Sequence, residues 1–162
     1  MAGLIAPPDN ADPADAVVFA DGWFPDIPLA LVRDRFRLGD NVVTTPRLVS
    51  AIEGAMISAF RALALWRAER IVAGAATFDL VTLARLNDRN MAEVLWERII
   101  GNFAAAELAD THRDVSATDD GLDRAEEKSE TADDYRRLAY HAIADLQSLG
   151  GEPAPRNRVA LV

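Results

Sequence analysis

The sequence predicts an all-α protein: a small helical bundle of three long helices plus a short one, with an extended N-terminal arm and a C-terminal extended tail. Apolar residues recur at three- and four-residue spacing over three long stretches, which is the period of a helix face. Prolines gather towards the two ends of the chain, where they disfavour regular helix. We therefore divide the 162 residues into an arm (1–25), a helical domain (26–151) and a tail (152–162).

The arm comes first and carries most of the prolines. Five of the eight fall within the first 28 residues: Pro7, Pro8, Pro13, Pro25 and Pro28. Because proline fixes φ and lacks an amide hydrogen, the arm is predicted to be extended. Trp23 and Phe24 stand at its end, and we expect these two apolar side chains to anchor it.

Two helices are predicted after the arm. A short one begins at Pro28, which suits a first helical turn, and ends near Gly39. Thr45 and Pro46 begin the first long helix, as a capping hydroxyl followed by a proline at the first helical position. Gly74 closes it after about seven turns. Its apolar face consists of Leu48, Ile52, Ala55, Met56, Ala59, Leu63 and Trp66.

Residues 75–89 fit either a short helix or an apolar loop packed on the bundle. Another long helix runs from about Asn90 to about Asp110, and a polar connection follows from Thr111 to Asp120. The predicted apolar face of this helix consists of Met91, Leu95, Ile99, Phe103 and Ala106.

The last long helix, from Asp120 to Leu149, is strongly acidic at its start. Eight acidic residues between positions 119 and 134 stand against Arg124 and Lys128, a local charge of minus six. Gly150 and Gly151 then stop the helix. An apolar stripe still runs along it: Leu122, Ala125, Ala132, Ala139, Ala142, Ile143 and Leu146.

Composition excludes several classes of protein. The net charge of −9 argues against tight binding of nucleic acid, which needs clustered Lys and Arg, but it allows DNA to pass nearby. No cysteine is present, so the chain has no disulfide framework and no thiolate chemistry. The first residues lack the basic start and apolar run of a signal peptide, and no run of about 18 consecutive apolar residues is found. We expect no membrane partner.

No motif predicts an enzyme, a cofactor or a metal site. Residues 116–127 have the spacing of an EF-hand loop, but Ser116 stands where Asp is needed and Asp123 where an apolar residue is usual. His112 and His141 lack the spacing of metal ligands. Nucleophile, phosphate-binding and dinucleotide-binding motifs are also missing from the sequence.

The carboxylates at the start of the acidic helix have two interpretations. They are Asp119, Asp120, Asp123, Glu126, Glu127, Glu130, Asp133 and Asp134. The simpler interpretation is a solvated helix face. The functional one is a ring of like charge, formed when many copies assemble, that repels a passing polyanion and keeps it moving through a channel.

The tail also has two interpretations. Its candidate partner-binding residues are Arg156, Arg158, Val159, Leu161 and Val162. Polar and apolar residues alternate there, after a tether stiffened by Pro153 and Pro155. The tail either folds back on the core or adds a strand to the edge of another subunit or of a partner.

Two blocks of the chain are similar to a known family. They span Asp26 to Glu69 and His112 to Gln147, and the chain closes with RVALV. The most telling parts are TPRL at 45–48, AMIS at 55–58, LWRA at 65–68, and the run from Ala125 to Arg137. These residues resemble the head completion (head stabilisation) protein of temperate contractile-tailed phages, the gpL type. The resemblance covers about residues 24–162, and Phe60 stands where the family pattern has a polar residue.

The resemblance implies a structural adaptor that is not an enzyme. In that family, copies form a homo-oligomeric ring, usually a dodecamer, beneath the portal protein after DNA packaging. The ring extends the DNA channel, retains the packaged DNA, which passes through without specific binding, and offers a surface for the tail terminator or another neck protein. The location implied is the head–tail neck of the virion, after synthesis in the cytoplasm of the bacterial host.

The alternative from the residues alone is an intracellular acidic helical module that binds or regulates a basic partner. The mass of the purified chain discriminates between the two. A regulator should be a monomer or a dimer, whereas a connector should form a ring on the portal.

Overall fold

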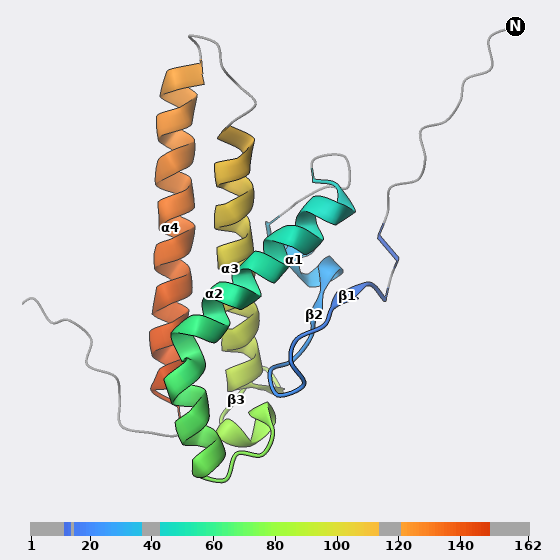
Figure 1. Cartoon of the computed structure of the whole chain (residues 1–162), viewed down its shortest axis with the longest axis vertical. Coiled ribbons are helices and arrows are strands. Elements are labelled where there is room, and N and C mark those ends of the chain that lie inside the picture. The colour runs from blue at the N-terminus through green and yellow to red at the C-terminus, as the bar shows by residue number, and fades with distance from the viewer. Residues whose placement is uncertain (1–11, 14, 37–42, 114–120, 150–162) are drawn as a thin grey trace, which may run out of the picture.

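Four α-helices dominate the computed structural model, which describes residues 12, 13, 15–36, 43–113 and 121–149 and gives only the backbone of 112–113 and 121–130. The described residues also contain one 3-10 helix and two small antiparallel sheets of two strands each. The all-α class predicted from the sequence is confirmed. Figure 1 shows two long helices, α3 and α4, standing side by side, with a third, α2, crossing them obliquely.

Helix α2 (Thr45–Val72) matches its prediction closely. All seven residues of its predicted apolar face are buried. Ala73 caps the C-terminal end, and Gly74 follows with a φ of +104°, a conformation that glycine adopts without strain. One detail of the prediction is wrong. Thr44 is the N-cap, and the Thr45 hydroxyl, predicted to cap the helix, donates instead to the carboxylate of Asp12.

The apolar character of α2 extends beyond its core face. By length and composition alone it could cross a membrane, because one 18-residue window has a mean hydropathy of 1.6, and 39% of that window is buried. Core helices of soluble proteins pass the same test. Since α2 contributes eight buried residues to the bundle, we interpret it as a core helix.

Helices α3 (Met91–Arg113) and α4 (Gly121–Gln147) form the long pair in Figure 1. Helix α3 begins and ends close to the predicted positions, but Thr111–Arg113 belong to the helix and not to the polar connection. Its predicted apolar face was partly wrong. Ile99 and Ala106 are buried as expected, whereas Met91, Leu95 and Phe103 are half-buried. The additional buried residues are Ala92, Trp96, Ile100, Gly101, Asn102, Ala104, Ala105 and Leu108.

The end of the predicted arm is part of the core. Strand β1 (Val17–Val18) pairs antiparallel with strand β2 (Ile27–Pro28), and the chain turns between them at Gly22, whose φ is +84°. Trp23 and Phe24, in the connection, are buried, which confirms their predicted role as anchors. Helix α1 (Leu29–Phe36) follows directly, so the predicted short helix begins one residue after Pro28.

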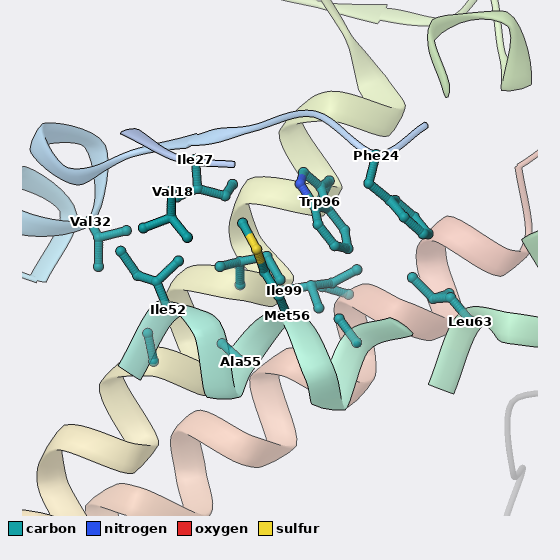
Figure 2. Packing of buried hydrophobic residues seen from close by; sticks show 14 of the residues in the cluster. Val18, Phe24, Ile27, Val32, Ile52, Ala55, Met56, Leu63, Trp96 and Ile99 are labelled. Carbon is teal, nitrogen blue, oxygen red and sulfur yellow. The ribbon is translucent and has the colours of Figure 1, made fainter. Parts of the chain in front are cut away.

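An aromatic cluster joins this N-terminal segment to the helices. The Phe24 ring stacks on the Trp96 ring of α3 with centroids 4.4 Å apart, and Phe60 of α2 stacks on Phe24 at 5.3 Å. Trp96 Nε1 donates to the backbone oxygen of Pro25 (2.9 Å), and Trp23 Nε1 donates to that of Ala75 (3.1 Å). Figure 2 shows Phe24 and Trp96 within the buried cluster. Phe60, the residue at which the resemblance would have a polar side chain, therefore packs in apolar surroundings.

Residues 75–89, for which a short helix and an apolar loop were both predicted, form a structured connection. A 3-10 helix, η1 (Phe78–Val81), leads into a hairpin of β3 (Arg85–Leu86) and β4 (Arg89–Asn90). Asn87 and Asp88, between the two strands, have φ values of 49° and 58°, as a tight hairpin turn requires. The Asn90 side chain then accepts from the Ala92 amide at 2.9 Å and so satisfies the start of α3.

A buried polar clamp holds the described start of the chain. The Asp12 carboxylate accepts from Nε and Nη2 of Arg33 on α1 and from the Thr45 hydroxyl on α2. Arg33 Nη1 donates to the backbone oxygen of Val43 at 2.9 Å. Both members of the ion pair are 8% exposed as side chains. The clamp therefore ties the arm, α1 and the start of α2 together.

Candidate functional site

The surfaces available for assembly are the strongest functional features among the described residues. No group of three or more His, Cys, Asp or Glu in that part of the chain is placed to hold a metal ion. His141 lies exposed on α4.

The predicted acidic residues lie on or just before α4. Asp119 and Asp120 fall outside the described residues. Four more lie on the helix in the part where only the backbone is described: Asp123, Glu126, Glu127 and Glu130. Asp133 and Asp134 are fully described, and both are exposed.

Asp133 and Asp134 each pair with an arginine one turn further along α4. Arg136 contacts Asp133 at 2.7 Å, and Arg137 contacts Asp134 at 2.7 Å. Arg136 also pairs with Asp110 of α3. Such exposed pairs contribute little stability, but they reduce the net negative charge at this level of the helix. The concentrated negative charge therefore lies nearer the start of α4.

The predicted tail residues fall outside the described part of the chain, but the structure shows where the tail begins. Gln147, the last residue of α4, donates from Nε2 to the backbone oxygen of Ala62 on α2 at 3.4 Å. Leu149 is half-buried against the core. The last described residues before the tail therefore lie beside the C-terminal half of α2.

An exposed apolar stripe on α2 was missed in the sequence analysis. The described side chains of Ile57, Leu65 and Val72 are 59%, 75% and 89% exposed. Their spacing of eight and seven residues places them on one side of the helix, away from the core face. The sequence signal was available: α2 has a second set of apolar residues out of phase with the first.

A hollow of about 250 Å³ opens where α2, α3 and α4 meet. Its lining residues are Gly54, Ala55, Ser58, Phe103, Ala106, Glu107, Asp110, Arg136 and Tyr140. The Glu107 carboxylate lies against α2 at Gly54, where any Cβ atom would collide with it. Sequence reasoning did not find this hollow, because its lining residues come from three helices whose packing is not encoded in any local motif.

Glu107 is the most perturbed acid of the hollow. Burial raises the pKa of its carboxyl above the ordinary value of 4.5. The residue as a whole is exposed, because one side of it faces the mouth of the hollow while the other packs on α2. Asp110 and Arg136 also line the hollow, so its lining contains two acidic side chains and one arginine.

Comparison with known proteins gave one family. The family described as phage head completion protein (GPL) matches residues 18–157 of the chain. This range includes the four described helices, the β3–β4 hairpin, the β1–β2 pair except for Val17, and the start of the tail. No match was found among the curated proteins or among the solved structures.

Proposed function

The chain belongs to the phage head completion protein (GPL) family, and from that membership we propose that its copies form a ring, a dodecamer, beneath the portal protein. Family membership gives a structural role in head completion and a place in the virion. The match over residues 18–157 is the observation that carries the proposal. The proposed ring extends the DNA channel, retains packaged DNA and offers the attachment surface for the tail terminator or another neck protein.

The surface of the subunit supports assembly into a ring. The stripe of Ile57, Leu65 and Val72 leaves large apolar side chains in water in a lone subunit, and exposed apolar surface marks protein contacts. Heterologous contacts between two different patches close into a ring when the rotation between copies divides a full turn. A structural role of this kind requires no catalytic residues.

The acidic start of α4 is the proposed wall of the channel. Eight carboxylates between positions 119 and 134 outnumber two basic residues, and such a surface repels the phosphates of DNA instead of binding them. Asp133 and Asp134 are exposed on the described part of this segment. A density map of the assembled neck tests the placement, and carboxylates that face outward from the ring would contradict it.

The tail is the proposed contact with the portal or with an adjacent subunit. Arg156, Arg158, Val159, Leu161 and Val162 alternate charge and apolar area after two prolines, which suits addition of an extended strand to a partner. Deletion of residues 153–162 should abolish assembly on the portal while the helical content by circular dichroism stays unchanged. Normal assembly of this truncated chain would show that the tail is incidental.

The decisive experiment measures mass with and without the portal. The purified chain is mixed with purified portal rings, and complexes are weighed by mass photometry and imaged by electron microscopy. We expect a discrete ring of added mass on the portal and packaged DNA that is retained in completed heads. The alternative, an acidic helical regulatory module made in the host cell, is favoured if the chain stays a monomer or dimer and ignores the portal.

A further inference from the structure

We propose that the hollow between α2, α3 and α4 is a binding site for a basic, apolar peptide, and that in the isolated subunit the C-terminal tail of the same chain occupies it. The hollow is the one lined by Gly54, Ser58, Glu107 and Tyr140 among others. The tail is residues 150–162. The inference concerns the free chain and so goes beyond the proposed role in head completion.

The shape of the hollow suits an extended segment. The absence of a side chain at Gly54 lets the Glu107 carboxylate lie against the backbone of α2, and Ser58 lies exposed one turn further along the same helix. Phe103 of α3 and Tyr140 of α4 contribute an apolar wall, with their rings in edge contact at 5.4 Å between centroids. A hollow with one apolar wall and two acids against one arginine in its lining accepts a peptide that alternates cations with aliphatic side chains.

The charges of the hollow and the tail are complementary. Glu107 forms no ion pair with another described side chain, whereas Asp110 pairs with Arg136. The tail carries Arg156 and Arg158. Because Glu107 is partly withdrawn from water, an ion pair with an arginine there is screened less than an ordinary surface pair.

The tail begins close enough to reach the hollow. Tyr140 precedes the end of α4 at Gln147 by seven residues, or about 10 Å along the helix axis. If the chain reverses at Gly150–Gly151, the five residues from there to Arg156 span about 16 Å when extended. The first arginine then arrives at or just beyond the level of Tyr140. Attachment to the same chain also gives the tail an effective concentration in the millimolar range for this site.

The apolar end of the tail then has a surface to cover. Residues 159–162 continue about 13 Å past Arg156–Arg158 in an extended chain, beyond Gly54 and towards the start of α2. A lone subunit would otherwise leave Val159, Leu161 and Val162 in water. Docking in the hollow therefore buries apolar residues of the tail and neutralises Glu107 in one contact.

The absence of cysteine from the sequence gives a clean test. We would introduce the pair Ser58→Cys and Ala154→Cys into the full-length chain and treat it, at low concentration, with a short bifunctional maleimide, because Ala154 comes just before Arg156 and should lie near Ser58 when the tail is docked. The matched control is Ala64→Cys with Ala154→Cys. Ala64 is also small and exposed, lies nearer to the end of α4, and is turned about 120° away from Ser58 around α2.

The expected result is rapid intramolecular cross-linking of the Ser58 pair, seen as a monomer-sized product of altered gel mobility, with much slower reaction of the Ala64 pair. Equal rates for both pairs would overturn the inference, because an undocked tail samples both positions. Dimer-sized products that exceed monomer-sized ones would also overturn it, since the occupant would then be the tail of a second copy.

A charge variant tests the chemistry of the contact. In the Ser58 pair, Glu107→Gln or Arg156→Gln should each slow the cross-link about two- to fivefold, while Glu53→Gln, at an exposed position of α2 outside the lining, should not. No slowing by either of the first two substitutions would refute the ion pair. Ring formation on the portal is measured separately, so either proposal can fail without the other.

Discussion

Removing the carboxylate of Asp12 should destabilise the whole fold, although this residue stands at the very start of the described chain. Its side chain accepts three hydrogen bonds, two from Arg33 and one from Thr45. The change Asp12→Asn keeps the size and removes the charge. It removes the carboxylate that accepts from Nε and Nη2 of Arg33, whose side chain is 8% exposed.

The expected magnitude follows from the burial of this pair. Breaking a fully buried ion pair by removing one partner costs about 3–5 kcal/mol. The clamp lies at the edge of the molecule, and Arg33 keeps its bond to the backbone oxygen of Val43 at 2.9 Å. We therefore expect a loss of about 2–3 kcal/mol in the free energy of unfolding, close to the cost of two hydrogen bonds to charged groups.

The dependence on pH gives a second prediction of the same experiment. The hydrogen bond from Arg33 is the largest cause that holds the pKa of Asp12 below its ordinary value of 3.8. Because the pKa is lower in the folded state, the stabilisation is present above pH 3.8 and is lost as the pH falls through the lowered value. The difference between wild type and Asp12→Asn should therefore be complete at pH 7 and shrink below pH 3.8.

The assay is urea unfolding followed by tryptophan fluorescence, because Trp23 and Trp96 are buried in the core. The matched control is Asp15→Asn, an exposed acid three residues further along. If the two variants unfold within about 0.5 kcal/mol of each other, the scatter typical of surface substitutions, the clamp does not stabilise the fold and the reasoning is refuted.

Two further substitutions test the packing around α3 and the aromatic cluster. Gly101→Ala should cost about 1–3 kcal/mol, because its Cβ would lie 2.9 Å from the Phe36 ring; the double variant with Phe36→Leu should recover part of this loss in thermal unfolding, and no loss in the single variant would contradict the close approach. Phe60→Leu removes the stacking on Phe24 and Trp96 but keeps an apolar side chain, so it should cost about 1–2 kcal/mol. The exposed Leu65→Ala on the same helix serves as its control.

Helix positions were predictable from the sequence where one apolar face dominates. In α2 the residues from Leu48 to Trp66 follow the helical period without interruption, and all seven predicted positions are buried. In α3 apolar residues occur on nearly all sides. A period alone could not decide between Leu95 and Trp96, and the structure buries Trp96 because it stacks on Phe24, 72 residues away in the sequence.

The N-terminal segment shows why proline content alone is a poor guide to order. Pro25 and Pro28 fit an extended chain, as expected, but extended residues can also pair. Val17–Val18 and Ile27–Pro28 do so over two residues each. The hydrogen bond from Trp96 Nε1 to the Pro25 oxygen adds a long-range tie that no local pattern contains. The aromatic pair at 23 and 24 was the informative signal in this segment.

Helix α2 has apolar residues on two sides, and the second side is the surface that we expect to be used in assembly. A helix that is apolar on one side needs one neighbour, and the core supplies it through residues such as Ile52 and Leu63. A helix that is apolar on two sides needs a second neighbour, and in the described residues Ile57, Leu65 and Val72 have none. Only the first side was predicted from the sequence, because the helical period was assigned to a single apolar stripe. For a member of a head completion family, the second side is where we expect an adjacent copy to pack. The substitution pair Leu65→Glu and Val72→Glu should then abolish ring formation on the portal with little change in the stability of the monomer.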